Sequence, residues 1–501
     1  MASYITKSLY VNYAACPRQF YYAKFNPEEL DTDSDYAKSI IQKGVVIGKV
    51  AHLYFKDTAK VNVNKIPNLE LQVETTRKLI EDPKTDAIAE ASFIYNDLYC
   101  AVDILKRDGD GWAIYEVKAS ADSEKDKYYP DVAFQKYVLE KCGLKVNHYY
   151  LMHLNRDYVR HGDIDVNQLL IPDSYKYDEK FIEAEKMIDA NLDDIRRILN
   201  SKQLPDYGPR CTKSCPFFTF CHKDLPIPNL TSINHFQANK AHEYFKQGIV
   251  TYKDALKAGV ELKTKTGNVR KEVQVQVGVS EVSPYINKEE VAKFLHQLKY
   301  PLYHLDFETY SEPIPPFDGA HPYQVVPFQY SLDIELTQGG KIDHHEFLAE
   351  KMDAMRELAE QLCKDIPMNV TSIAFNANFE RNVIKHLAEK FPDLSDHLTN
   401  IQNNIVDLAI PFMKGYYYDI KQGGSNSIKY VMPALCPHME DAYLKLPFVH
   451  NGGEAMTAFP QMMEEPKDEE YQKKRQGMLM YCALDTLSMV KVLNVLYKAI
   501  K

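Results

Sequence analysis

Residues 98–118 read LYCAVDILKRDGDGWAIYEVK, and they decide the architecture expected for the first third of the chain. Two alternating runs, 98–105 and 112–118, flank a turn rich in Asp and Gly, which is typical of a β-hairpin. If the hairpin is centred on Gly109–Asp110, each residue of the first strand has a defined partner on the second. The stretch therefore predicts two strands and also their register.

Two carboxylates face each other in this register. Asp103 lies directly across from Glu116, with Cβ atoms about 5 Å apart, and Lys118 shares a face with Glu116 because side chains alternate along a strand. Two facing acids repel unless a divalent cation lies between them, and a nearby lysine can stabilise an attacking hydroxide or a developing phosphorane charge. The pattern indicates metal-dependent phosphodiester chemistry, although a solvent-facing hairpin edge explains it about as well.

Two neighbouring segments carry polar side chains that suit the same chemistry. Asp131 and Gln135 are four residues apart on an expected helix, so they share one face of it. His52 stands in GKVAHLYF on another expected helix, where a histidine is structural about as often as it is a metal ligand. These segments add two polar side chains on one helix face and a candidate metal ligand to the hairpin.

The region resembles the PD-(D/E)XK nuclease core of the RecB type. The family's motif residues, its upstream histidine and the glutamine of its Q-x-x-x-Y motif are matched by Asp103, Glu116, Lys118, His52 and Gln135. The resemblance implies a restriction-endonuclease-like fold, catalysis by the two acids, the lysine and the glutamine, and Mg²⁺ or Mn²⁺ held by His52, Asp103 and Glu116. The chain departs at Leu139, where the family has tyrosine, so a role for Tyr137 is a separate hypothesis.

Four of the nine cysteines form a second pattern. One stands in ACPRQFYYAKF and three follow in RCTKSCPFFTFC, and these four are Cys16, Cys211, Cys215 and Cys221. The spacing differs from the two close pairs of a zinc finger and from the compact ferredoxin run. It resembles the CRISPR-associated RecB-like nucleases and the AddAB-type helicase-nucleases, which implies that these four hold a 4Fe–4S cluster; structural zinc and coincidence are the alternatives.

A second acidic site is expected in the last part of the chain. Residues 302–308, LYHLDFE, form an apolar strand on which Asp306 and Glu308 point to one face. Farther on, GMLMYCALDTLSMVKVL is an apolar helix that carries Tyr481 and Asp485 one turn apart, and a buried aspartate there needs a partner or a metal ion. Carboxylates from separate segments are what two divalent ions at a phosphodiester site require.

The order of these motifs resembles the DEDD exonucleases of the RNase H-like fold. That resemblance implies metal binding by Asp306, Glu308, Glu380 and Asp485, with Tyr481 orienting the attacking water. The family has Asp where Glu380 stands here, in AFNANFERNVIKHL, so metal spacing and activity can differ. Asp407, in NIVDLAIPF, either supports the missing charge or is a structural residue at the end of a strand.

A chain of 501 residues is long enough for two or three domains, and a Pro-rich boundary at LPIPNLTS helps to place them. We expect a RecB-like nuclease in 1–228, a connector of small helices in 229–297 and an exonuclease-like domain in 298–501, which together make an α/β protein. FDGAHPYQVVPFQYSLDI and GGSNSIKYVMPAL are similar to segments of an uncharacterised bacterial family with this two-domain plan. In the second segment Ser425, Ser427 and Lys429 either hold phosphates or belong to a plain turn before a helix.

Composition restricts the function further. With 45% hydrophobic and 26% charged residues and no apolar run near the roughly 20 residues of a membrane helix, we expect a cytoplasmic protein without a membrane partner. The net charge of −10 argues against a basic, repressor-like DNA binder, but it suits an enzyme that holds phosphates through metal ions.

We therefore expect a metal-dependent nuclease with two sites that acts on nucleic acid, preferably DNA as single strands or ends. Two rivals stay open, namely a nucleic-acid-binding or assembly subunit with one inactive site and an exonuclease of RNA processing. The resemblances suggest phage defence, CRISPR adaptation or repair as the setting, and they leave protein partners open.

Overall fold

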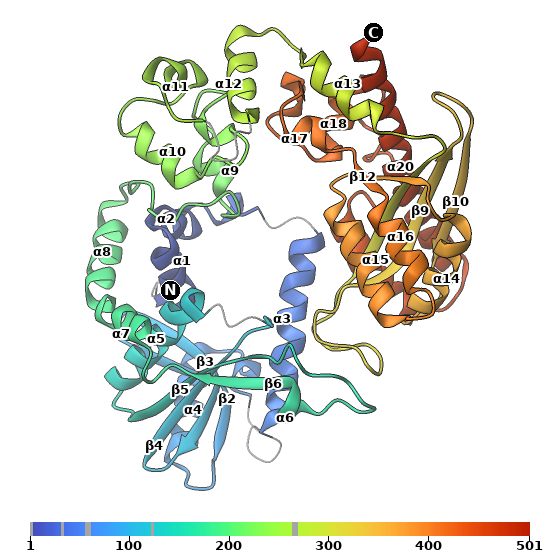
Figure 1. Ribbon diagram of the computed structural model, residues 1–501. Helices are drawn as coiled ribbons and strands as arrows, with labels where there is room; N and C mark the ends of the chain where they lie inside the picture. The colour runs from blue at the N-terminus through green and yellow to red at the C-terminus, as the bar shows by residue number, and fades with distance from the viewer. Residues whose placement is uncertain (1–3, 32–34, 56–61, 122–124, 263–268) are drawn as a thin grey trace. The chain divides into compact units, whose positions relative to one another are not determined.

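The computed structural model describes residues 4–31, 35–55, 62–121, 125–262 and 269–501. The chain forms two compact units, which we call the N-terminal and the C-terminal unit (Figure 1). The first comprises Met1–Asp224 and Glu312–Gln324, and the second comprises Leu225–Ser311 and Val325–Lys501. Both combine helices with a mixed sheet, so the predicted α/β class is confirmed.

The N-terminal unit is built on one six-stranded sheet. Its strands are β1 (Ile5–Thr6), β2 (Ala87–Tyr95), β3 (Leu98–Asp108), β4 (Gly111–Val117), β5 (Val146–Leu154) and β6 (Leu170–Ser174). Its helices are α1 (Lys7–Ala15), α2 (Pro17–Phe25), α3 (Asp35–Tyr54), α4 (Leu69–Glu81), α5 (Lys125–Lys141), α6 (Val166–Leu169), α7 (Glu179–Lys186), α8 (Ile188–Ser201) and α9 (Phe218–Cys221).

Strands β3 and β4 form the predicted hairpin with the predicted register. Ile104 pairs with Tyr115, so Asp103 and Glu116 are the next residues of the two strands in the direction away from the turn. Gly109, in the two-residue turn, has φ of +61°, a left-handed conformation that glycine adopts without a Cβ penalty. The prediction succeeded because a short turn fixes the register of both strands.

The two edges of β3 are used differently. Strand β2 pairs antiparallel along one edge, from Leu98 to Lys106. The other edge pairs with β4 over 104–108 and, farther along, with β1 in parallel over 98–99. Helix α1 begins directly after β1, so its first residue emerges beside the stretch of β3 between these two partners.

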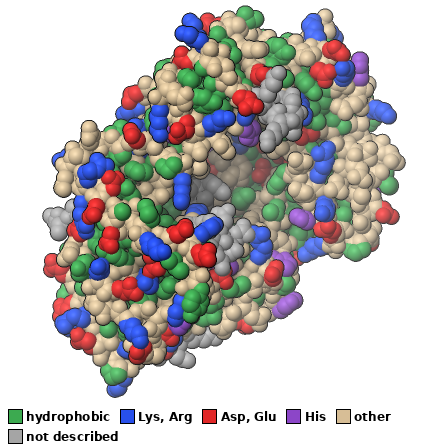
Figure 2. All heavy atoms as spheres, turned by 60° about the vertical axis from the view of Figure 1, so that its left-hand side comes forward, with side chains coloured by type: hydrophobic (Ala, Val, Ile, Leu, Met, Phe, Trp, Pro, Cys, Tyr) green, Lys and Arg blue, Asp and Glu red, His purple; other side chains and the backbone are tan. Residues whose placement is uncertain are grey.

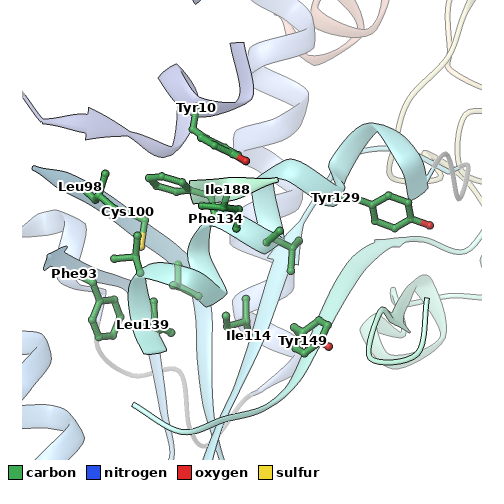
Figure 3. Close-up of a cluster of buried hydrophobic side chains, with 14 of the residues drawn as sticks. Tyr10, Phe93, Leu98, Cys100, Ile114, Tyr129, Phe134, Leu139, Tyr149 and Ile188 are labelled. Carbon is green, nitrogen blue, oxygen red and sulfur yellow. The ribbon is translucent and has the colours of Figure 1, made fainter. Parts of the chain in front are cut away.

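The core of the N-terminal unit fixes α1 on the sheet. Figure 3 shows Tyr10 of α1 facing Phe134 of α5, and the two rings stack with centroids 4.8 Å apart. Both side chains are fully buried, and Asn191 of α8 donates a hydrogen bond to the Tyr10 hydroxyl at 3.0 Å. Such dense packing leaves α1 little freedom to shift.

A segment distant in sequence completes this unit. Residues 312–324 return to it, and the N–H of Gly319 donates to the carbonyl of Arg160 at 2.8 Å while the N–H of Arg160 donates to that of Ala320. The structure thus groups 312–324 with the first part of the chain.

The C-terminal unit contains a five-stranded sheet in the order β10-β9-β8-β11-β12. Its strands are β8 (Leu302–Tyr310), β9 (Val326–Glu335), β10 (Ile342–Leu348), β11 (Thr371–Ala374) and β12 (Ile405–Asp407), with a separate ribbon of β7 (Tyr285–Ile286) and β13 (Tyr417–Tyr418). The pairs β10–β9 and β9–β8 are antiparallel, whereas β8–β11 and β11–β12 are parallel. All ten side chains of β9 are buried, so both faces of the sheet are covered there.

The helices of this unit include those of the segment 229–297. They are α10 (Ala238–Phe245), α11 (Tyr252–Ala258), α12 (Arg270–Ser280), α13 (Lys288–His296), α14 (Met355–Asp365), α15 (Asn378–Lys390), α16 (Ser395–Asn403), α17 (Ile410–Met413), α18 (Ile428–Leu435), α19 (Gly452–Glu464) and α20 (Glu469–Ile500). Small helices were expected in 229–297, and α10 and α11 confirm them. The structure places 229–297 within the C-terminal unit.

Helix α20 is the one described helix whose length and composition would allow it to cross a membrane. Its most apolar window has a mean hydropathy of 1.4, and 67% of that window is buried inside the protein. A core helix of a soluble protein passes the same test, and α20 packs on β8 and β9, so its apolar character is explained by the core.

Candidate functional sites

The N-terminal carboxylate cluster consists of Asp103 on β3, Glu116 on β4 and Asp131 on α5. Because side chains alternate along β4, Glu116 points into the protein and is only 1% exposed. Helix α5 brings Asp131 over the same end of the sheet. Three acids in one buried place repel one another, so the cluster needs cations.

Side chains that the sequence singled out contact this cluster. Lys118 Nζ donates to Glu116 Oε1 at 2.6 Å and to Asp131 Oδ2 at 2.8 Å. Gln135 Nε2 donates to Glu116 Oε2 at 2.7 Å and to Asp131 Oδ1 at 3.0 Å. The structure thus brings together Asp103, Glu116, Lys118 and Gln135.

A second lysine, which sequence reasoning missed, lies among the same acids. Lys7, the first residue of α1, places its Nζ 3.0 Å from Glu116 Oε2, 3.4 Å from Asp131 Oδ1 and 3.8 Å from Asp103 Oδ1. Its distance of 109 residues from Glu116 leaves no local pattern that could have revealed it.

The pKa values of Asp103 and Glu116 are shifted in opposite directions. Burial first, and then repulsion by Glu116, raise the pKa of Asp103 to about 7, although the N–H of Val117 donates to it at 2.7 Å. Burial alone would raise the pKa of Glu116, but Lys118 and Lys7 hold it well below its ordinary value. The lysines therefore favour the charged form of Glu116, whereas burial and the charge of Glu116 disfavour the charged form of Asp103.

The cluster opens into a cavity of about 740 Å³. His52 of α3 lines it and is half-buried, and burial and then Lys65 lower the pKa of His52, which favours the neutral form that binds metals. Glu90 of β2 lines the cavity too, with a backbone φ of +57°, and sequence reasoning missed it. Tyr137 has another role, because its hydroxyl donates to Asp189 Oδ1 at 2.5 Å.

The four cysteines of the predicted cluster line a second cavity, of about 380 Å³, which we call the cysteine cavity; they are Cys16, Cys211, Cys215 and Cys221. All four are free thiols. A Cβ on Gly208 would lie 2.6 Å from Cys16 Sγ, so residue 208 must be glycine for this thiol to fit. Cys16 follows α1 and Cys221 ends α9, so segments far apart in sequence meet at this cavity.

The thiols of this cavity affect one another. Burial first, and then Cys16, Cys221 and Cys215, raise the pKa of Cys211 to about 12. Arg18 lies 3.7 Å from Cys221 Sγ, and its positive charge is suited to an anionic sulfur. Four converging thiols that oppose one another's ionisation become compatible when metal ions bind their thiolates, so the donors fit an iron–sulfur or a zinc group.

The C-terminal carboxylate cluster has four members: Asp306, Glu308, Glu380 and Asp485. Asp306 and Glu308 lie two residues apart on β8, Glu380 is in the first turn of α15, and Asp485 is on α20. Glu308, Glu380 and Asp485 are 7%, 4% and 6% exposed. The structure brings together all the acids that the sequence assigned to metal binding in this unit.

Mutual repulsion dominates this cluster after burial. Burial and then Asp485 raise the pKa of Glu308 to about 8, and burial, with Asp407 and Asp485, raises that of Glu380 to about 8. Burial and then Asp485, Glu308 and Glu380 raise the pKa of Asp306 well above its ordinary value. Oxygen Oε2 of Glu380 is buried without a hydrogen-bond partner. Oxygen ligands of this kind fit Mg²⁺ or Mn²⁺.

Three residues beside this cluster were not predicted as its partners. Tyr443 donates its hydroxyl to Asp485 Oδ1 at 2.5 Å. Lys429 Nζ lies 5.3 Å from the ring centre of Tyr481 and 5.8 Å from that of Tyr443, and it lowers the pKa of Glu308 against the effect of burial. Gly452, at the start of α19, has room for a Cβ 3.5 Å from Glu308 Oε2.

The remaining candidate residues have distinct positions. Tyr481 is 2% exposed, and its ring centre lies 6.2 Å from that of Tyr443. Asp407 Oδ1 accepts from the backbone N–H groups of Asn376 and Ala409, both at 2.9 Å, so it holds the turn before α15. Cys482 Sγ lies 3.7 Å from Asp306 Oδ2, and with Asp306 and Glu308 it forms a group able to hold a metal ion.

One comparison with known proteins gives a match. A family model described as a domain of unknown function, DUF2779, matches residues 303–427. This stretch contains Asp306, Glu308 and Glu380 but ends before Asp485. No curated protein matches the chain.

Proposed function

We propose that the chain is a metal-dependent nuclease that hydrolyses phosphodiester bonds at two separate sites, one in each unit. The observation that carries the proposal is the C-terminal carboxylate cluster, in which acids from β8, α15 and α20 are buried together. Acids with such mutually raised pKa values are costly without cations. Divalent cations neutralise them and supply the charge stabilisation that phosphodiester hydrolysis needs.

In the C-terminal unit, Asp306, Glu308, Glu380 and Asp485 would hold Mg²⁺ or Mn²⁺. Tyr481, beside Glu308 and Asp485, is suited to orient a water molecule, and Lys429 is suited to face a phosphate. A mixed sheet whose central strand carries the first two acids supports an RNase H-like fold as the finer assignment.

In the N-terminal unit, Asp103, Glu116 and His52 would hold the metal ion. Lys118 and Gln135 orient the Glu116 carboxylate, and Lys118 can also neutralise charge that develops on the phosphate. The order β2-β3-β4-α5-β5, with the acids on β3 and β4, supports a restriction-endonuclease-like fold.

We further propose that Cys16, Cys211, Cys215 and Cys221 hold a structural 4Fe–4S cluster. A cavity of about 380 Å³ is larger than a single ion needs, which favours a cluster over zinc. Because its ligands come from both ends of the unit, the cluster would stabilise the fold around the nuclease site.

Nucleic acid, as single-stranded DNA or DNA ends, is the proposed substrate, and the cytoplasm is the proposed location. On the face drawn in Figure 2, basic and acidic side chains are interspersed, which is typical of an enzyme that holds phosphates through metal ions rather than through a broad basic surface. CRISPR adaptation, phage defence and repair all need this activity.

A cleavage assay tests the proposal. Labelled single-stranded DNA and RNA of matched sequence are incubated with the protein and Mg²⁺, Mn²⁺ or a chelator. We expect cleavage only when a metal ion is present. Asp103→Asn should reduce the activity of the N-terminal site by about 100-fold or more, and Asp306→Asn should reduce that of the C-terminal site by as much. Asp193→Asn and Asp343→Asn, which alter exposed acids in the two units, are the controls.

The outcomes separate the rival functions. Absence of cleavage with either metal would reject the enzyme and favour a nucleic-acid-binding subunit. Loss of activity in Asp103→Asn alone would mean that the C-terminal site is inactive. Faster cleavage of RNA than of DNA would favour an RNA-processing enzyme.

A further inference from the structure

Lys7 occupies the centre of the N-terminal carboxylate cluster. Its ammonium lies within 3.8 Å of oxygen atoms of all three acids and donates hydrogen bonds to both oxygens of Glu116. A divalent cation in this cluster would use the same carboxylate oxygens. The two cations therefore compete for one set of ligands.

The backbone of Lys7 is fixed, although its side chain is not. Strand β1 pairs Ile5 with Leu98 of β3, and the Thr6 side chain accepts from the N–H of Leu9, so the start of α1 is anchored from both sides. Tyr10, one turn on, stacks on Phe134. Lys7 can thus leave the acids only by rotating its side chain.

The cavity beside the cluster can receive the rotated Lys7 side chain. Lys7 itself lines the cavity of about 740 Å³ together with Ser8, Asn12 and Asn62, which carry hydrogen-bonding groups and no negative charge. An ammonium that leaves Glu116 stays within this cavity, beside the place where a phosphate would meet the metal ion.

Charge balance favours an exchange over simultaneous binding. The cluster carries three carboxylates, and Lys118 supplies one positive charge to two of them. Lys118 and one divalent cation together balance the three negative charges of the cluster. The Lys7 ammonium is then left to Glu90, the fourth acid that lines the cavity, whose pKa the charge of Lys7 already lowers against burial.

We propose that Lys7 is a built-in competitor of the divalent cation: it holds the three carboxylates when no metal is bound, and its ammonium rotates into the cavity when a metal ion takes its place. Lys7 thereby sets the metal affinity of the site and keeps the acids assembled between catalytic cycles. This inference rests on the proposed function, because it takes the cluster to be a metal site.

The test measures Mn²⁺ affinity without any cleavage. Titrations followed by electron paramagnetic resonance of free Mn²⁺ use the full chain with Asp306→Asn and Asp485→Asn, so that only the N-terminal site binds. We expect Lys7→Met to bind Mn²⁺ at least about tenfold more tightly than this background, because removal of a unit charge at contact distance changes binding by at least that factor.

Lys49→Met is the matched control. Lys49 lines the same cavity and carries the same charge, but it is exposed on α3, so its removal should change Mn²⁺ affinity by less than about twofold. Equal effects of the two substitutions would overturn direct competition, as would unchanged or weaker Mn²⁺ binding in Lys7→Met.

A second measurement covers the case in which Lys7→Met folds poorly. The variant leaves three acids with one lysine, so its unfolding temperature without metal should fall and should recover with Mn²⁺ by more than that of the background. Recovery no larger than in the background would overturn the proposal. If the background itself binds no Mn²⁺, and Asp103→Asn leaves its unfolding temperature with Mn²⁺ unchanged, the proposed metal site fails and the competition by Lys7 fails with it. Failure of the competition alone is recognised by a background that does bind Mn²⁺.

Discussion

Lys7 and Cys16 lie at opposite ends of α1, so one helix joins the N-terminal carboxylate cluster to the cysteine cavity. Val11, in the middle of the helix, lines both cavities. The N–H of Cys16 also ends the helix by donating to the carbonyl of Asn12 at 2.9 Å. One helix thus carries residues of both the carboxylate cluster and the cysteine cavity.

The first prediction concerns this connection. Cys16→Ser should lose nearly all iron from anaerobically purified protein and lower the unfolding temperature, because one of the four proposed ligands, which come from distant segments, is removed. Iron analysis and visible absorbance measure the loss. Cys142→Ser, a half-buried thiol of the same unit that does not line the cavity, should keep the iron. Zinc in the wild type, or full iron in Cys16→Ser, would contradict the prediction.

The second prediction separates two residues of α5. Gln135→Leu should weaken Mn²⁺ binding at the N-terminal cluster and slow cleavage by about 10- to 100-fold, because Gln135 orients both Glu116 and Asp131. Tyr137→Phe should leave both unchanged, since its hydroxyl contacts Asp189. A slow Tyr137→Phe variant would show that Tyr137 takes the place of the missing tyrosine after all.

The parts of these sites that lie close together in sequence could be predicted from it. Asp103 and Glu116 face each other because a two-residue turn fixes the register, and Asp306 and Glu308 share a face because strands alternate. These arrangements follow from local geometry alone.

The site residues that the sequence did not predict reach their sites because distant segments pack together. Lys7 reaches Glu116 only because β1 pairs with the far end of β3, and Tyr443 reaches Asp485 across 42 residues. Neither position carries a periodic or motif signal. Contacts of this kind are set by the tertiary fold, which a single sequence does not reveal through its local pattern.

The third prediction addresses Glu380, which stands where an aspartate was expected. Glu380→Gln should reduce the proposed exonucleolytic cleavage by about 100-fold or more, since it removes a carboxylate proposed to hold the metal ion. It should also raise the unfolding temperature of metal-free protein at pH 8, because an unpartnered buried carboxylate is removed. Glu389→Gln, at an exposed position of the same helix, is the control for both assays. Unchanged cleavage in Glu380→Gln would place the metal on the other three acids.

The fourth prediction is the pH dependence of the metal-free protein. The pKa values of Glu308 and Glu380 are raised to about 8 by burial and neighbouring acids, whereas unfolded glutamate titrates near 4. Between these values the folded state binds more protons than the unfolded state. Stability is therefore highest below pH 4 for these groups and is lost as the pH rises through about 8.

Thermal unfolding with a chelator from pH 5 to pH 9 measures this effect. We expect a loss of roughly 2 kcal/mol or more across the range, and a smaller loss with Mn²⁺ or in Glu308→Gln with Glu380→Gln. An equally steep loss in the double variant would assign the pH dependence to other groups.

The fifth prediction distinguishes the two tyrosines of the C-terminal site. Burial raises the pKa of Asp485, and hydrogen bonds from Tyr443 and from Tyr481 both oppose this effect. Tyr443→Phe should therefore raise that pKa further and move the acidic limb of the pH–rate profile to higher pH by about one unit. Tyr481→Phe should shift the profile in the same direction and should also lower kcat about tenfold or more at the plateau of the profile, because its proposed role is to position water. An unchanged plateau kcat in Tyr481→Phe, or an acidic limb that stays in place in Tyr443→Phe, would contradict these assignments.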